Sequence, residues 1–395
     1  MLAHAAKLWG KQLRDAADGL PVRTRKVVET LQHRGVKGLI DAVRKRRKGV
    51  QLVTDRSNAP AYTLSSEKAI RPLAMPQSDN PLVSINIPTY GQHRTTFACL
   101  ESIAEHSRGV DIEVIVVDDC FTEPAGTALS DVGGIEITRN TENLGFLKSC
   151  NRGAALARGQ YVVLLNNDTL VSASWLEYLL AVFHNFDDVG AVGAKLLFPD
   201  GKLQEAGGIV WRDASAWNFG RGQDPSAPIF NYVRQVDYCS GACLMLPRQL
   251  FRDIGGFDER FAPAYYEDTD LCFAVRDRGL CVYYQPRAEV IHFEGVSHGT
   301  DEASGTKAYQ ARNQKRFAEK WRMRLSGHMP NGVMPEQERD RGVTARILWI
   351  EACMLTPDQD SGSLRTARLL RILRQLGTKV TFMADNLEYR QPYAE

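Results

Sequence analysis

The chain has 395 residues, of which 44% are hydrophobic and 24% are charged, and its net charge at pH 7 is +2. This length allows two or three domains, and the composition is that of an ordinary globular protein. Its apolar runs all fall short of the roughly 18 to 20 residues of a membrane span, and its eight cysteines are scattered, which argues against a disulfide framework. Because the first residues also lack the apolar core of a secretory signal, we expect a cytoplasmic protein.

Positive charge is concentrated at the start of the chain. Residues 1–60 carry 14 Lys/Arg against 5 Asp/Glu, or +9, which leaves −7 for the rest. We expect residues 1–50 to form a basic helical arm, because the apolar side chains of 36–43 fall on one helical face. The arm either makes peripheral contact with the inner face of the plasma membrane or packs on the rest of the chain. Nucleic acid is not expected as a partner, since no recognised motif accompanies the basic run.

The next segment alternates strand and helix patterns. Residues 51–80 contain several prolines and are expected to be a linker. The elements predicted after it are strands at 82–88, 112–117, 135–138 and 161–165, and helices at 93–107 and 146–157. This β-α-β alternation predicts an α/β fold with a mostly parallel sheet covered by helices.

The pattern is mixed in the second half of the chain. The predicted elements are a helix at 172–186, strands at 190–197, 207–211, 236–246 and 281–292, and a helix at 305–324. Residues 329–344 are expected to be a second linker. The tail, 345–395, predicts a strand, an amphipathic helix and a strand. Because a lone β-α-β unit cannot bury both faces of its sheet, we expect this tail to be the truncated start of a second α/β domain in a longer protein.

Polar groups directly follow four of the apolar runs. They are Asp118-Asp119, Asn166-Asn167-Asp168, Glu267-Asp268 and His292. Side chains at the carboxyl ends of strands point into the crevice where open α/β sheets bind ligands. Carboxylates and an imidazole suit Mg²⁺ or Mn²⁺ beside a phosphate, and one carboxylate is left over as a base.

These residues stand in stretches that carry a family resemblance. The stretches, in chain order, are SINIPTYG (84–91), EVIVVDDC (113–120), NLGFLKSCNRG (143–153), YVVLLNNDT (161–169), VDYCSGACLMLPRQLFRDIGGFDERF (236–261), YYEDTDLCFAVRDRG (265–279) and VIHFEGVSHG (290–299). Residues 81–328 thereby resemble inverting nucleotide-sugar glycosyltransferases of family 2 with the GT-A fold, particularly the rhamnosyltransferase-like branch. The tail, 345–395, resembles the opening of a transferase of the GT-B type.

The resemblance implies a donor site. Thr89 and Asp119, with the adjacent Pro88 and Tyr90, would bind the pyrimidine base, whose edge offers donors and acceptors. Thr89 is alternatively a turn residue, and Asp118 is expected to brace the loop. The set implied to contact ribose or phosphate is Asn143, Gly145, Asn151 and Asn167. Asn143 is alternatively a helix cap.

The resemblance also implies a metal site. Asp168 and His292 would hold Mg²⁺ or Mn²⁺, with diphosphate oxygens and water completing an octahedron. Only one residue of Asn166-Asn167-Asp168 can be ionised, so we expect the metal to arrive largely with the nucleotide.

Glu267-Asp268 matches the general-base motif of the family, with Asp268 as the expected base. Glu267 and Asp270 compete for this role, because three carboxylates in four residues are also typical of a helix N-terminus. Gly241, Ala242 and Tyr265 would lie against the donor or acceptor sugar.

The implied activity is metal-dependent, inverting transfer of a sugar from a UDP- or dTDP-linked donor, of the hexosyltransferase class. The acceptor would be a hydroxyl of a bacterial surface polysaccharide or lipid-linked glycan. One rival is a sugar nucleotidyltransferase, although PTYGQHR does not resemble its Gly-rich basic loop. The other is an inactive module that binds nucleotide-sugar or glycan, suggested by the single acidic residue of 166–168.

Overall fold

The structure is a computed structural model that describes residues 70–294, 306–388, 390 and 393. Its described residues fall in two compact units, Arg56–Arg341 and a second unit that includes the residues from Gly342 onward. The predicted basic arm, 1–50, and the first part of the predicted linker, 51–69, lie outside the described residues.

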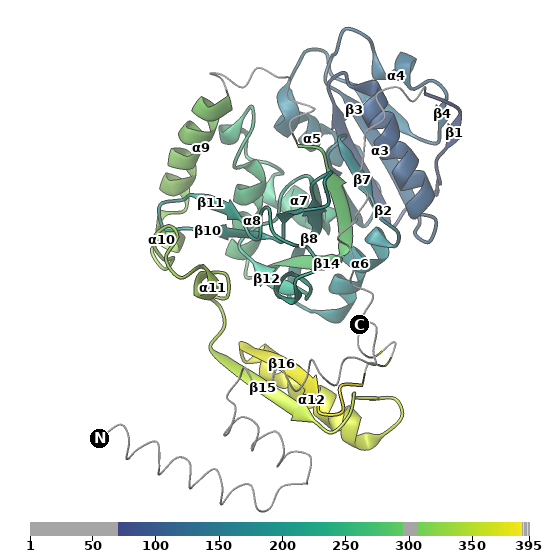
Figure 1. The fold of residues 1–395 in the computed structure, drawn as a ribbon. Coiled ribbons are helices and arrows are strands. Elements are labelled where there is room, and N and C mark those ends of the chain that lie inside the picture. Colours follow the sequence, from purple (N-terminus) through teal and green to yellow (C-terminus); the bar gives the residue numbers. More distant parts are fainter. Residues whose placement is uncertain (1–69, 295–305, 389, 391–392, 394–395) are drawn as a thin grey trace, which may run out of the picture. The chain divides into compact units, whose positions relative to one another are not determined.

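One mixed sheet organises the Arg56–Arg341 unit (Figure 1). Its strands within the described residues are β2 (Val83–Thr89), β3 (Ile112–Asp118), β5 (Glu136–Arg139), β6 (Tyr161–Leu165), β7 (Thr169–Val171), β8 (Val189–Leu197), β9 (Leu203–Glu205), β12 (Arg234–Val236), β13 (Cys243–Pro247) and β14 (Cys281–His292). They are ordered β12-β14-β8-β13-β6-β2-β3-β5, with β7 paired to β14 and β9 to β8. The strands β6, β2, β3 and β5 are parallel, whereas β13 runs antiparallel between β6 and β8.

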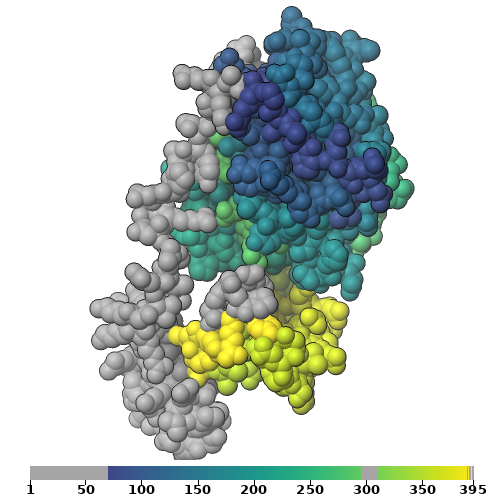
Figure 2. All heavy atoms as spheres, turned by 90° about the vertical axis from the view of Figure 1, so that its right-hand side faces the viewer, coloured from purple at the N-terminus to yellow at the C-terminus, as the bar shows by residue number. Residues whose placement is uncertain are grey.

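Helices cover both faces of this sheet (Figure 1). Those of the described part of the unit are α3 (His93–His106), α4 (Ala125–Ala128), α5 (Gly145–Leu156), α6 (Trp175–Asn185), α7 (Arg248–Ile254), α8 (Glu267–Asp277), α9 (Thr306–Lys320), α10 (Arg322–Leu325) and α11 (Pro335–Glu338). This arrangement confirms the predicted α/β fold with a helix-covered central sheet. The sheet is parallel, as predicted, over β6-β2-β3-β5, whereas β7, β9, β12 and β13 pair antiparallel with their neighbours. Its first strands and helices, coloured purple to blue, form most of the face of this unit seen in Figure 2.

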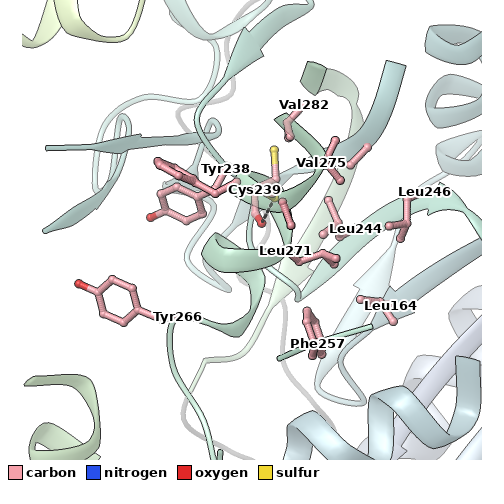
Figure 3. Packing of buried hydrophobic residues seen from close by; sticks show 14 of the residues in the cluster. Leu164, Tyr238, Cys239, Leu244, Leu246, Phe257, Tyr266, Leu271, Val275 and Val282 are labelled. Carbon is pink, nitrogen blue, oxygen red and sulfur yellow. Dashed lines mark hydrogen bonds between the residues drawn. The ribbon is translucent and has the colours of Figure 1, made fainter. Parts of the chain in front are cut away.

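The apolar runs form buried strands because successive side chains point to opposite faces. Val162 and Leu164 of β6 enter the core beneath α5 and α8, while Val163 and Leu165 enter the core beneath α3 and α6. Figure 3 shows part of the first core, including Leu164, Leu244 and Leu271. Burying each such side chain contributes about 1.5–3 kcal/mol. Two hydrophobic cores therefore hold the sheet between its helix layers.

Strand direction brings the predicted site residues to one edge of the sheet. The parallel strands β2, β3 and β6 end at the same edge. The strands β6 and β8 both run antiparallel to β13, and β14 is parallel to β8, so β14 also ends at this edge. The polar residues that follow β2, β3, β6 and β14 consequently gather there.

The second half of the sheet differs from the sequence prediction in one informative place. The strand predicted over 236–246 is two strands, β12 and β13, separated by a turn. A short hairpin of β10 (Gly208–Val210) and β11 (Ala216–Asn218) lies outside the main sheet. The turn matters because it contains Gly241 and Ala242.

Parts of both predicted linkers are packed. Residues 73–74 form β1, which pairs with β4 (Val132–Gly133). Residues 329–341 belong to the sheet unit: Glu338 is buried, and Arg341 forms an ion pair with Asp237 at 2.8 Å.

The described part of the other unit is a β-α-β unit, as predicted. It comprises β15 (Ala345–Glu351), α12 (Ser361–Gln375) and β16 (Thr378–Ala384), with β15 and β16 parallel. Asp360 caps α12 by accepting a hydrogen bond from the Ser363 N–H at 2.7 Å. The likeness of this tail to a GT-B transferase stays a prediction. Among the helices of the described ranges, none has the length and apolarity to cross a membrane.

Candidate active site

A buried hydroxyl and amide cluster lies at the end of β2. The hydroxyl of Thr89 donates to the Gly91 carbonyl at 2.9 Å and lies 2.9 Å from the Thr96 hydroxyl. The Asn167 amide donates to both hydroxyls, at 3.3 and 3.1 Å. Thr89 and Asn167 therefore join the ends of β2 and β6, in agreement with the turn role left open for Thr89.

The two aspartates after β3 both hold loops. Asp118 forms an ion pair with Arg139 at 2.6 Å, which fits its predicted bracing role. Asp119 is also buried, and its two oxygens accept backbone hydrogen bonds from Leu144 and Gly145 at 2.7 and 2.8 Å. The sequence interpretation placed Asp119 toward a ligand, whereas here both oxygens of Asp119 fix the start of α5.

The other residues predicted near the nucleotide differ in their availability. Asn143 is exposed, and its side-chain oxygen accepts from the Gly145 N–H at 3.1 Å, but the N-cap of α5 is Leu144 and not Asn143. Both ends of the Asn151 amide are bonded to the Phe257 backbone, at 2.8 and 2.9 Å. Tyr90, which follows Pro88 and Thr89 of β2, is 48% exposed. Among these side chains, Tyr90 and Asn143 are thus placed at the surface and Asn151 in a structural clamp.

The two residues predicted to hold a metal ion, Asp168 and His292, lie close together where β6 and β14 end. The Nε2 atom of His292 lies 3.3 Å from Oδ1 of Asp168 and 3.2 Å from Nδ2 of Asn166. The pairing of β14 with β7, which sets His292 opposite Thr169, brings these groups together. The Asn166 side-chain oxygen is buried without a hydrogen-bond partner in the described residues. The structure therefore gathers Asn166 with the predicted ligands, whereas Asn167 points to the β2 cluster.

The turn between β12 and β13 connects this pair to the predicted base. The Asn166 N–H donates to the Ala242 carbonyl at 3.1 Å. The Gly241 N–H donates to Oδ2 of Asp268 at 3.0 Å. One backbone hydrogen bond and one hydrogen bond to the Asp268 carboxylate thus join Asn166 to Asp268 through Gly241 and Ala242. The residues from Asp168 and His292 through this turn to Asp268 form one continuous row, called the wall.

The predicted base stands at the first turn of a helix. Glu267 is the first residue of α8, so the helix N-terminus that the sequence offered as an alternative is present. Tyr265 and Tyr266 precede it with φ of 74° and 72°, a backbone conformation that costs free energy outside glycine. Asn313 of α9 holds this bend by donating to the Tyr265 carbonyl at 3.0 Å.

Burial tunes the two adjacent carboxyl groups. Burial raises the pKa of Asp268, which accepts from the Thr269 N–H at 2.6 Å. Burial, and secondarily the charge of Asp268, raise the pKa of Glu267 to about 8. Burial therefore disfavours the ionised form of both carboxyl groups, and for Glu267 the negative charge of Asp268 adds to this effect.

Comparison with known proteins identifies the family of residues 84–255. Residues 84–255 match the family model described as Glycosyl transferase family 2. The chain carries a glycosyl transferase family 2 domain. Among curated relatives, the O-antigen biosynthesis protein RfbC of Myxococcus xanthus is 31% identical over 241 residues. The N-acetylglucosaminyl-diphospho-decaprenol L-rhamnosyltransferase of Mycobacterium tuberculosis is 26% identical over 258 residues.

The two alignments cover different shares of these relatives. The match to RfbC covers 57% of this chain and 18% of that protein, and the match to the rhamnosyltransferase covers 58% and 80%. The chain thus spans 18% of the length of RfbC and 28% of that of another curated relative, the protein y4gI of Sinorhizobium fredii, but 80% of that of the rhamnosyltransferase. Among solved structures, GalNAc-T7 with UDP, GalNAc and Mn²⁺ is 17% identical, with a TM-score of 0.49, over 63% of this chain and 50% of that one.

Two buried residues of the family 2 domain escaped the sequence analysis. Gln204 and Glu205, both in β9, are at most 1% exposed. Gln204 contacts His292, and Glu205 accepts from the Ser240 N–H at 2.9 Å. The sequence signal for them was a pair of adjacent polar residues in the otherwise apolar stretch LQEAGGIV (203–210). Because adjacent strand residues point to opposite faces, the pair does not form a polar stripe on one face.

Proposed function

We propose that the family 2 domain is a metal-dependent, inverting glycosyltransferase that uses a UDP- or dTDP-sugar. The observation that carries this proposal is the continuous wall from Asp168 and His292, through Gly241 and Ala242, to Asp268. Such a wall can hold a diphosphate at one end and a proton acceptor at the other. The family 2 match supports the reaction class.

The side chains near His292 fit a divalent cation. Asp168 and His292 offer an oxygen and a nitrogen 3.3 Å apart, and the buried Asn166 side-chain oxygen has no hydrogen-bond partner in the described residues. No group of three or more His, Cys, Asp or Glu side chains in the described ranges is arranged to hold a metal ion. We therefore propose that Asp168 and His292 hold Mg²⁺ or Mn²⁺ together with nucleotide oxygens. When bound, the ion would supply positive charge to the departing diphosphate.

Asp268 is the proposed general base. It would take the proton from an acceptor hydroxyl while that oxygen forms a bond to the anomeric carbon and the bond to the diphosphate breaks, with inversion. The raised pKa of Asp268 strengthens it as a base, and its hydrogen bond to Gly241 holds it beside the turn. Tyr265, Gly241 and Ala242 are proposed to contact the sugars.

We propose that the nucleotide of the donor binds at the exposed surface around Tyr90. Thr89, Asn167 and Asp119 shape this surface from beneath through their bonds to strand ends and to α5. A direct contact of Asp119 with the pyrimidine base would require one of its backbone bonds to open. Tyr90 and Asn143 are the side chains most available to a nucleotide.

The acceptor is proposed to be a surface polysaccharide or a lipid-linked glycan. This follows the relatives named for O-antigen biosynthesis and for rhamnosyl transfer to a diphospho-decaprenol. We further propose a cytoplasmic location at the inner face of the membrane, to which the basic residues of 1–50 would contribute.

Ligand-induced stabilisation tests the donor site. UDP, dTDP, GDP and CMP are added with and without Mn²⁺ to the wild type, to Asp168→Asn, and to Asp111→Asn, an exposed aspartate, as a control. A ligand at 100 times its Kd adds about 2.7 kcal/mol to the free energy of unfolding. We expect Mn²⁺-dependent stabilisation by UDP or dTDP in the wild type and the control, and its loss in Asp168→Asn.

Turnover separates an enzyme from an inactive binding module. Slow, Mn²⁺-dependent release of nucleoside diphosphate from UDP- or dTDP-sugars is expected of the wild type. Stabilisation without any release or transfer would instead favour the inactive module. An absence of both would refute the proposed donor site.

A further inference from the structure

Gln204 lies behind His292, on the side away from Asp168. It belongs to β9, is 1% exposed, and is 88 residues from His292 in sequence. Its side-chain oxygen is 2.9 Å from Nδ1 of His292. The opposite ring nitrogen, Nε2, is the atom that faces Asp168 at 3.3 Å. Gln204 and Asp168 thus contact the two nitrogens of one imidazole.

The orientation of the Gln204 amide follows from its other partners. Its NH₂ group lies 3.2 Å from the Glu294 carboxylate and 3.5 Å from the His292 carbonyl, and both of these groups only accept hydrogen bonds. Arg221 holds the same Glu294 oxygen at 2.7 Å. The Gln204 oxygen must therefore face the ring, and it can only accept.

This orientation decides which ring nitrogen carries the proton. Because the Gln204 oxygen accepts, Nδ1 of His292 must donate, and neutral His292 keeps its lone pair on Nε2. The Asn166 amide is placed to donate to that lone pair at 3.2 Å. With Nε2 unprotonated, the imidazole presents a ligand atom on the Asp168 side.

We propose that Gln204 is a positioning residue that fixes His292 in the Nδ1–H form, so that Nε2 is ready to bind a divalent cation. This inference rests on the proposed function for its metal, but its first step concerns the imidazole alone. Partners of this kind on the distal nitrogen of a ligating histidine fix the tautomer and ring orientation, and losing one typically weakens metal affinity by 10- to 100-fold. Arg221 and Glu294 complete the chain of contacts.

The test combines nitrogen NMR of the metal-free 395-residue chain with Mn²⁺ binding. The protein is labelled with ¹⁵N-histidine, and the His292 signal is assigned by its loss in His292→Asn. Gln204→Leu removes the acceptor with a similar volume, and Gln204→Glu restores an acceptor oxygen. The control is Gln235→Leu, which removes an amide from β12 that contacts Asp188 and Tyr283. Mn²⁺ affinity is measured by the electron paramagnetic resonance of free Mn²⁺ in the presence of UDP.

The wild type and the Gln235→Leu control are expected to show His292 with a protonated Nδ1. In Gln204→Leu, His292 should shift toward the Nε2–H form, Mn²⁺ affinity should fall by about 10- to 100-fold, and Gln204→Glu should restore the tautomer. A wild-type His292 protonated on Nε2, or an unchanged tautomer in Gln204→Leu, would overturn the inference. If the wild type binds no Mn²⁺ with UDP while the tautomer responds as expected, the proposed metal site fails, and only the role of Gln204 in fixing the His292 tautomer stands.

Discussion

Glu205, which lies behind the wall, allows a quantitative test of how burial shifts the pKa of a carboxyl group near the predicted site. Its side chain is fully buried, one oxygen accepts from the Ser240 N–H at 2.9 Å, and the other has no hydrogen-bond partner in the described residues. Burial raises its pKa from 4.5 to about 8; Asp268 adds to the rise, and Arg221 and Arg234 oppose it. The variant Glu205→Gln keeps an oxygen for Ser240 but cannot ionise.

The sign of the effect follows from proton binding. Between pH 4.5 and 8 the folded protein holds a proton on Glu205 that the unfolded chain releases. The contribution of Glu205 to stability is therefore complete below pH 4.5 and is lost as pH rises toward 8. One pKa unit corresponds to about 1.4 kcal/mol, so the full window is worth up to about 5 kcal/mol. The free energy of unfolding of Glu205→Gln, relative to the wild type, should rise by up to about 1.4 kcal/mol per pH unit.

Urea unfolding at pH 5, 6, 7 and 8, followed by tryptophan fluorescence, measures this difference. Glu136→Gln, which changes an exposed glutamate of β5, is the control and should give the same difference from the wild type at each pH. Parallel pH profiles for wild type and Glu205→Gln would refute the argument, because they would mean that Glu205 ionises equally well in the folded and unfolded chain.

Three further variants test the wall and the bend before it. Asp268→Asn should lower the transfer rate by about 10²- to 10⁴-fold with unchanged UDP–Mn²⁺ affinity by calorimetry, and a near-normal rate would remove Asp268 as base. Asn313→Ala removes an NH₂ group whose two hydrogens are shared among the carbonyls of Phe261, Ala264 and Tyr265, and it should cost roughly 2–3 kcal/mol in urea unfolding. A loss under about 0.5 kcal/mol would contradict the clamp. Asn166→Asp puts a second carboxylate beside His292 and should tighten Mn²⁺ binding without nucleotide, and equal or weaker binding would place Asn166 outside the metal site.

Local patterns predicted the strands that end at the site. The runs before Asp118 and Asn166 are mostly apolar and almost wholly buried, as two-sided burial in a helix-covered sheet requires. The same kind of pattern predicted a single strand at 236–246, because residues 239–246 (CSGACLML) are mostly apolar. Carboxyl groups from distant segments bond to the backbone there and produce the turn instead.

The sequence by itself determined the family, the main strands β2, β3, β5, β6, β8 and β14, and which polar residues follow four of its apolar runs. These depend on local periodicity, on strand direction and on short motifs that can be read along the chain. Only the tertiary structure decided what each polar group contacts. It turned Asp119 toward the start of α5, placed Asn166 beside His292, and put Gln204 and Glu205 behind the wall. A side chain's partner depends on which distant segments packing brings within hydrogen-bond reach, and no local pattern records that.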